Sequence, residues 1–178
     1  KNSKEAPVLV NVYGETTQNG TPTPDAPVDI DSVELTEVRS CGKNLLDMSD
    51  AKSGTISGIT VTVNIDGSYS YKGTAEHGAI NVWLLGNWGL TNELFTLPKG
   101  TYYVKGVNLY YNQSTLASGR DGGVVTFSTD QPISGVRAVN AVVGTTYNET
   151  HYPIIARSDV AVDYEPYKGT KATLSAPI

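Results

Sequence analysis

The sequence has a single cysteine, Cys41, so no disulfide bond can form within the chain. Stability must therefore come from packing, and a body of about 150 residues is large enough to bury a hydrophobic core without cross-links. No apolar run approaches the roughly 20 residues that a membrane-spanning helix needs, and no signal peptide opens the chain. We predict that the chain does not insert into a membrane.

Positive charge is also scarce. The sequence has 13 Lys and Arg against 18 Asp and Glu, which gives a formal net charge of −5. The basic residues are scattered and form no stripe along the chain. Because binding to a phosphate backbone needs a basic surface, we predict that nucleic acid is not a partner.

The common catalytic motifs are missing as well. There is no G-x-S-x-G nucleophile elbow, no P-loop and no dinucleotide-binding glycine motif. His77 and His151 stand in polar, turn-like contexts without a second metal ligand nearby, so we predict that both are solvated loop histidines. The acidic run in residues 29–37 resembles a solvated strand face more than the paired carboxylates of a glycosidase. We predict that the chain is not an enzyme, although a hydrolase built from distant carboxylates stays open.

What the sequence does contain is many short runs of β-branched and aromatic residues, bounded by Gly, Pro, Asn and Asp. No segment has a sustained helical period, and only Met48–Gly54 suggests a short helical turn. The number and spacing of the runs predict an all-β, antiparallel sandwich or jelly roll. The predicted strands are Val8–Thr16, Val28–Arg39, Ile59–Asn64, Ser68–Thr74, Ala79–Leu85, Glu93–Leu97, Thr101–Tyr111, Val124–Thr129, Val136–Val143, Tyr152–Arg157 and Val160–Tyr164.

The register of one hairpin follows from the order of its residues. In "ITVTVNIDGSYSYKG", Asp66-Gly67 is a strong turn signal. A two-residue loop would divide the apolar side chains between the two faces. A three-residue loop, in which Gly67 is left-handed in a G1 bulge, places Val63 opposite Tyr69 and puts the apolar set on one face. We therefore predict the three-residue loop.

Two features of the alternation point to side chains outside the core. In "GTYYVKGVNLYY" the apolar phase changes at Gly106, which suggests a bulge. Tyr103, Lys105, Asn108 and Tyr110 are then expected to point away from the core. In "AINVWLL" the apolar phase is Ile80, Val82 and Leu84, so Trp83 falls on the opposite face, where it needs a cover or a ligand.

The segment "TQNGTPTPDAPV" contains three prolines within six positions. Each proline fixes its own φ and favours an extended conformation in the residue before it. We predict a semi-rigid, polyproline-like spacer that joins or projects other parts of the protein. The chain begins at Lys1 without a methionine, and we expect it to be a piece of a longer protein.

Several stretches together resemble a known family. These are "GETTQNGTPTPDAPVDIDSVE", "CGKNLLD", "VNIDGSYSYKGTA", "LPKGTYYVKG" and "YPIIARSDVAVDYEPYKG", in this order. The ordered set, which covers nearly the whole chain, resembles minor structural, baseplate or receptor-binding tail proteins of phages that infect Gram-positive bacteria. In that family the central module is similar to a carbohydrate-binding jelly roll.

The resemblance implies a domain organisation and a location. Residues 1–40 would be an N-terminal strand with a Pro-rich arm, 41–167 the jelly roll, and 168–178 a linker to a following module. The protein would be part of the virion, in a phage tail that contacts the bacterial surface. Its partners would be other tail subunits and host cell-wall or surface polysaccharide, and a homotrimer or homohexamer is plausible because tails are symmetric.

Glycan binding follows from the kinds of side chain present. The sequence has 11 Tyr and two Trp but only two Phe, and rings with a polar group are typical of hydrated interfaces. Sugars stack their C–H faces on flat rings and bond their hydroxyls to planar polar groups. The predicted ligand-binding residues are Trp83, Trp88, Tyr103, Tyr110, Asn81, Asn87, Lys105 and Arg137. The alternative is that Trp83 packs beneath the N-terminal arm and the tyrosines line a subunit interface.

The resemblance also suggests a structural calcium ion, since jelly rolls of the carbohydrate-binding type often hold one near their first and last strands. Asp47 and Asp163 occupy the corresponding places, although each could simply cap a strand end. We predict no other cofactor. The predicted function is a non-enzymatic tail module that contributes to host attachment. The alternatives are a purely structural tail-assembly module and a piece of a polysaccharide hydrolase.

Overall fold

The structure, a computed structural model, describes residues 9–18, 30–77, 82–87 and 92–173, and side chains only where these ranges fall within 42–169. The described residues form strands, turns and irregular segments and contain no helix. Accordingly, the described part of the chain holds no helix long and apolar enough to span a membrane. For the described residues, the predicted all-β architecture with antiparallel sheets is confirmed, and the jelly roll stays a prediction. The chain divides into two compact units, residues 1–42 with 168–178 (unit 1) and residues 43–167 (unit 2).

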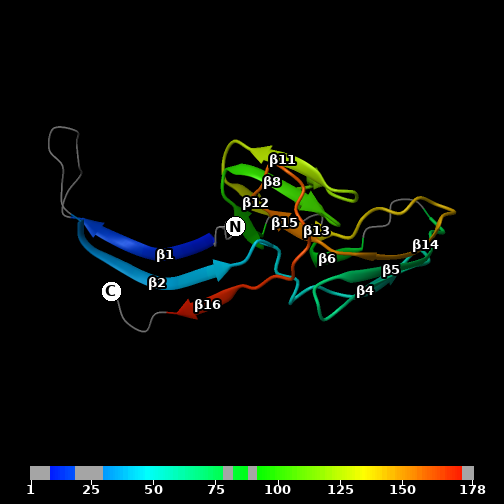
Figure 1. Cartoon of the computed structure of the whole chain (residues 1–178), viewed down its shortest axis with the longest axis horizontal. Helices are drawn as coiled ribbons and strands as arrows, with labels where there is room; N and C mark the ends of the chain where they lie inside the picture. The colour runs from blue at the N-terminus through cyan, green and yellow to red at the C-terminus, as the bar shows by residue number, and fades with distance from the viewer. Residues whose placement is uncertain (1–8, 19–29, 78–81, 88–91, 174–178) are drawn as a thin grey trace, which may run out of the picture. The chain divides into compact units, whose positions relative to one another are not determined.

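Unit 1 is a three-stranded antiparallel sheet in the order β1-β2-β16. Its strands are β1 (Leu9–Gln18), β2 (Ile30–Cys41) and β16 (Thr170–Thr173). Figure 1 shows β1 and β2 as two long strands side by side. In chain order, unit 2 is inserted between β2 and β16. Most of the proline-rich segment, residues 19–29, lies outside the described residues, and the prediction that 168–178 leads to a further module stays a prediction.

Unit 2 contains the remaining strands, arranged in four antiparallel groups. The first group is β14-β5-β4-β3, with β3 (Gly54–Ile56), β4 (Ile59–Val63), β5 (Tyr69–Thr74) and β14 (Thr146–His151). The second is β10-β9-β13-β6, with β6 (Trp83–Gly86), β9 (Asn108–Tyr111), β10 (Ser114–Ser118) and β13 (Gly135–Arg137). The third is β11-β8-β15, with β8 (Gly100–Lys105), β11 (Gly123–Phe127) and β15 (Ile154–Ala156), and the fourth pairs β7 (Phe95–Leu97) with β12 (Gln131–Ile133).

The main core of unit 2 lies among these groups. Ile59, Val61 and Tyr69 come from the first group, and Leu84 and Leu109 from the second. All of them are fully buried, as the apolar positions of alternating strands should be. The predicted core phase of Val82 and Leu84 is confirmed, whereas Ile80 lies outside the described residues.

The predicted register of the Asp66-Gly67 hairpin is confirmed. Val63 pairs with Tyr69, the Asn64 backbone N–H donates to Ser68 O at 2.8 Å, and Gly67 N–H donates to Asn64 O at 3.0 Å. Gly67 has φ +79°, a conformation that residues with a Cβ rarely adopt. The apolar set decides between the two registers because only one of them buries Val61, Tyr69 and Tyr71 together.

The segment Thr101–Tyr111 was predicted to be one bulged strand. It forms two strands in different sheets. The chain leaves β8 after Lys105, turns at Gly106 and enters β9 at Asn108. Tyr103, Asn108 and Tyr110 point away from the main core, as expected, but they do not form an open surface, because they are only 7%, 4% and 3% exposed. Each is covered on the face of its strand that does not line the main core.

Other strand predictions were incomplete. Val160–Tyr164 forms no strand. Met48–Gly54 contains no helix but a hydrogen-bonded turn, in which Ala51 N donates to Met48 O at 3.1 Å, and Asp47 Oδ1 accepts from Ser49 N at 2.9 Å at its start. The strands that were missed are β3, β10, β12, β14 and β16. They are short or polar, so their pairing partners rather than their own composition place them in sheets.

One tight turn supports a stability prediction. Asn112 and Gln113 connect β9 to β10 with φ +43° and +64°, the signature of a type I′ turn, in which Asn-Gly is preferred. We expect Gln113→Gly to raise the free energy of unfolding by about 0.5–1 kcal/mol, because glycine adopts positive φ without a steric cost. Urea denaturation measures the change. Ser114→Gly, one residue further and within β10, should instead lower stability, and a loss in both variants would contradict this explanation.

Candidate functional site

Three of the predicted ligand-binding residues meet on one face of the β10-β9-β13-β6 sheet. Arg137 on β13 pairs with Trp83 on β6, and on the other side with Asn108 on β9. Gly135 pairs with Tyr110. Since alternate residues share a face, these side chains lie opposite Val136 and Leu109, which are in the core.

The three side chains form a compact group that we call the platform: Trp83, Tyr110 and Arg137. The Trp83 and Tyr110 ring centroids are 5.0 Å apart, with an interplanar angle of 74°. Arg137 Cζ lies 4.6 Å from the Tyr110 ring centroid and 5.8 Å from that of Trp83. Both distances are within the range of cation–π attraction. Trp83 and Arg137 are half-buried, so the platform retains an accessible surface.

A glycine makes room for the indole. A Cβ atom at Gly135 would lie 2.6 Å from Trp83 Cζ3 and 3.0 Å from the backbone oxygen of Asn87. Any side chain at this position would displace the ring or the loop that follows β6. The absence of a side chain at 135 therefore determines how Trp83 lies over β13. Burial lowers the pKa of the Arg137 guanidinium, yet the group stays charged at neutral pH.

The other predicted residues lie elsewhere or outside the described ranges. Asn87 is exposed at the end of β6, beside Gly135. Tyr103 packs in a separate apolar cluster with Ile154 and Ala156, and Lys105 is exposed at the end of the same strand, β8. β8 belongs to a different sheet from the platform. Trp88 and Asn81 lie outside the described residues.

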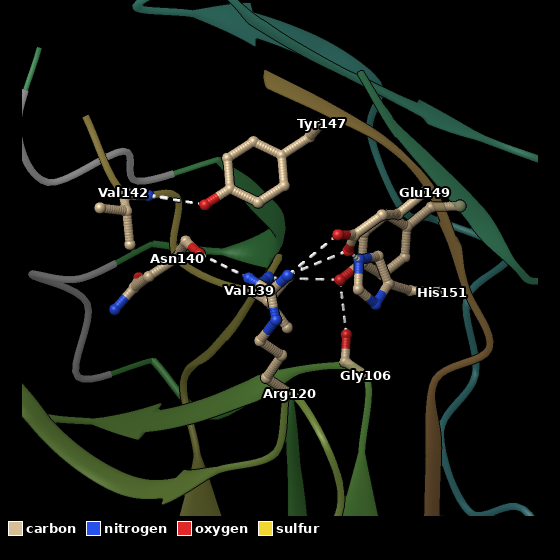
Figure 2. Close-up of polar contacts among 9 residues, drawn as sticks. Gly106, Arg120, Val139, Asn140, Val142, Tyr147, Glu149 and His151 are labelled. Carbon is tan, nitrogen blue, oxygen red and sulfur yellow. Dashed lines mark hydrogen bonds and ion pairs between the residues drawn. The ribbon is translucent and has the colours of Figure 1, made fainter. Parts of the chain in front are cut away.

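A polar network that the sequence analysis missed continues from this face. Asn108, which is opposite Arg137, accepts a hydrogen bond at Oδ1 from Gly119 N at 3.2 Å. The next residue, Arg120, places Nη2 at 3.1 Å from both carboxylate oxygens of Glu149 on β14. Figure 2 shows the guanidinium of Arg120 between Glu149 and the backbone oxygen of Asn140, to which Nη1 donates at 3.3 Å.

His151 belongs to the same network. The prediction that it is a solvated loop histidine is wrong. It lies on β14 with a side chain 11% exposed, and its ring stacks on Tyr69 with centroids 5.1 Å apart. His151 Nε2 is 3.1 Å from Glu149 Oε2. The prediction failed because "TYNETH" resembles a polar turn, whereas pairing with β5 makes it a strand. His77 is exposed, as expected.

Tyr69 connects this network to the backbone. Its hydroxyl donates to Gly106 O at 2.5 Å and accepts from Val139 N at 3.2 Å. Burial raises the pKa of the Tyr69 hydroxyl above its ordinary value, so it stays protonated and can donate. The hydroxyl thus holds the turn between β8 and β9 and the segment after β13 in fixed positions.

The environment of His151 predicts a pH-dependent stability. Burial lowers the pKa of the imidazole below 6.5, opposed by the charge of Glu149 and assisted by that of Arg120. Below pH 6.5 the unfolded chain therefore binds the proton more readily than the folded one, and stability present above pH 6.5 is lost as the pH falls. We expect the free energy of unfolding to decrease between about pH 7.5 and about pH 5.5, and His151→Gln to reduce this decrease. Equal slopes in the two proteins would contradict the assignment.

The predicted calcium ligands do not form a recognisable donor set. Asp47 and Asp163 are both exposed, and Asp47 Oδ1 is engaged in the turn with Ser49. Among the described residues no three His, Cys, Asp or Glu side chains gather closely enough to hold a metal ion. These side chains alone do not fit the six to eight oxygen ligands that calcium takes. The calcium site stays a prediction.

Comparisons of the chain with protein-family models, with curated proteins and with solved structures found no match. Chemically, the platform offers ring surface and one cation, and the adjoining network offers a paired carboxylate and guanidinium. Such a combination suits a ligand with both apolar C–H faces and hydroxyl groups.

Proposed function

We propose that this chain is a non-enzymatic module of a phage tail, in the baseplate or receptor-binding part, which helps the virion attach to its host by binding a cell-surface glycan. Unit 2 would be a jelly roll of the carbohydrate-binding type. Its partners would be other tail subunits, in a symmetric trimer or hexamer, and a polysaccharide of a Gram-positive cell wall. The ordered set of tail-protein-like stretches supports the tail assignment.

The observation that carries the glycan part is the platform. The platform is formed by three adjacent strands, β6, β13 and β9, which carry Trp83, Arg137 and Tyr110. The two ring centroids are 5.0 Å apart, and Arg137 Cζ lies 4.6 Å from the centroid of Tyr110 and 5.8 Å from that of Trp83. Trp83 is half-buried although it lies on the face away from the main core. A partly exposed indole can stack on a sugar ring, and the planar cation beside it can bond to the hydroxyls of the sugar.

The second candidate is a structural tail module without a ligand. It is favoured by the burial of Tyr110, which is only 3% exposed and thus contributes more to packing than to a free surface. Under this alternative, Trp83 and Arg137 would contact another tail subunit. Aromatic residues and arginine are enriched in the centres of protein interfaces, so composition alone does not separate the two functions.

Titration with purified cell-wall polysaccharides from Gram-positive bacteria tests the proposal. The full chain should bind at least one of them saturably and release no reducing sugar from it. Saturable binding without hydrolysis supports the proposed function. Binding to none of them, together with self-association in solution, favours the structural alternative. Release of sugar would show that the chain is a hydrolase and contradict the non-enzymatic assignment.

A further inference from the structure

The hydroxyl of Tyr71 is buried without a hydrogen-bond partner among the described residues. Tyr71 lies on β5 and is 0% exposed. Four other tyrosine hydroxyls of unit 2, those of Tyr69, Tyr102, Tyr147 and Tyr164, each bond to a backbone atom. An enclosed hydroxyl without a partner lowers the stability of the fold, because its hydrogen bonds to water are lost on folding and are not replaced.

Two rings that carry polar groups pack against the Tyr71 ring. The Tyr71 ring packs edge-on against Tyr147, with centroids 5.3 Å apart, and against His151 at 5.9 Å. The charges of Arg120 and Glu149 act on the hydroxyl, and so does that of Arg137 in the platform. Burial is the main reason that its pKa is raised to about 12, so it is a neutral group that can donate and accept. Both ring neighbours of Tyr71 also contact the ion pair: Arg120 Cζ lies 5.4 Å from the Tyr147 ring centroid, and His151 Nε2 lies 3.1 Å from Glu149 Oε2.

The ion pair is open to solvent. Arg120 and Glu149 side chains are 37% and 39% exposed, although Nη2 of Arg120 lies 3.1 Å from both carboxylate oxygens. Each group has more bonding capacity than this contact uses: a guanidinium has five N–H donors, and a carboxylate has about four lone-pair sites. Neighbouring hydroxyls of a sugar ring can bond to both at once, donating to the carboxylate and accepting from the guanidinium.

We propose that Tyr71, Arg120 and Glu149 form a second, polar subsite next to the platform, which binds the hydroxyl groups of a further sugar residue of the same glycan. This inference rests on the proposed function. Arg120 and Glu149 hold neighbouring hydroxyls at the surface, and the Tyr71 hydroxyl, which is enclosed in the free protein, bonds to the ligand through a water molecule. The ligand is then an oligosaccharide rather than a single sugar.

Tyr71→Phe tests the subsite because it should change stability and affinity in opposite directions. Removing a hydroxyl that has no partner in the free protein should leave the unfolding midpoint in urea unchanged or higher. The affinity of the full chain for the purified cell-wall polysaccharide should fall about five- to tenfold, the effect of one lost hydrogen bond. Tyr102→Phe is the matched control, since the Tyr102 hydroxyl already donates to Pro98 O. The control should lose stability and keep its affinity.

Wild-type affinity in Tyr71→Phe, when Trp83→Ala binds more weakly than the wild type, would overturn the subsite and leave the proposed function intact. A parallel loss of stability and affinity in Tyr71→Phe would also overturn it, because the hydroxyl would then bond within the protein. If the wild type binds none of the polysaccharides, both the proposed function and the subsite are wrong.

Discussion

Asn44→Ala is expected to lower the free energy of unfolding of unit 2 by about 4 kcal/mol, roughly 1 kcal/mol for each of four hydrogen bonds. Asn44 is 2% exposed. Its Oδ1 accepts from Leu46 N at 3.0 Å and Ile155 N at 3.2 Å, and its Nδ2 donates to Pro153 O at 3.0 Å and Glu165 O at 3.1 Å. One side chain thereby joins the beginning of unit 2 to its last strand and its end.

The cost is large because alanine would leave four backbone groups without these bonds, most of them buried. Both tryptophans of the chain lie within residues 43–167, so tryptophan fluorescence in urea reports on unit 2. Asn148→Ala is the control, since Asn148 is exposed on β14, and it should change stability by less than about 0.5 kcal/mol. A loss below about 1 kcal/mol in Asn44→Ala would show that water replaces the amide.

Trp83→Ala is expected to weaken glycan binding at least about tenfold, which corresponds to about 1.4 kcal/mol or more. The indole is the largest accessible ring of the platform, and it also positions the Arg137 guanidinium 5.8 Å from its centroid. Its removal should therefore affect both stacking and polar contacts. Calorimetric titration of the full chain with the polysaccharide measures the change, and urea denaturation verifies that the variant is folded.

Two further variants show whether binding depends on the position of the Trp83 indole and on this ring in particular. Gly135→Ala keeps the indole but places a Cβ atom where Trp83 Cζ3 would be only 2.6 Å away, so it should also weaken binding. Tyr152→Ala removes a ring that is 47% exposed and packs against Tyr164, away from the platform residues, and should bind as the wild type does. If Trp83→Ala binds normally, or if Tyr152→Ala weakens binding equally, the platform is not the glycan site.

Local features of the fold were predictable where residue order alone decides between two arrangements. The Asp66-Gly67 hairpin is such a case, because a shift of one residue would move Tyr69 and Tyr71 from the core to solvent. The change of phase at Gly106 was also visible. It was not predictable that β8 and β9 enter different sheets, because the choice of partner strand depends on residues far away in the chain.

The residue types of the candidate site were predictable, but which of these residues come into contact was not. Trp83 stood out because it breaks the apolar phase of its strand. Its contact with Tyr110 and Arg137 depends on the strand order β9-β13-β6, which no local pattern encodes. The Arg120–Glu149 pair was missed for the same reason, because 29 residues separate the two in sequence and Glu149 lies on a strand that composition does not reveal.

Trp83 can itself report whether the platform binds glycan. Trp88→Phe leaves Trp83 as the only tryptophan in the chain, so its fluorescence can be followed while the polysaccharide is added. If the face carrying Trp83, Tyr110 and Arg137 binds glycan, the emission should change saturably, with the same midpoint as binding measured by calorimetry. Polysaccharide binding that leaves the Trp83 emission unchanged would contradict the account, because the ligand would then occupy another surface.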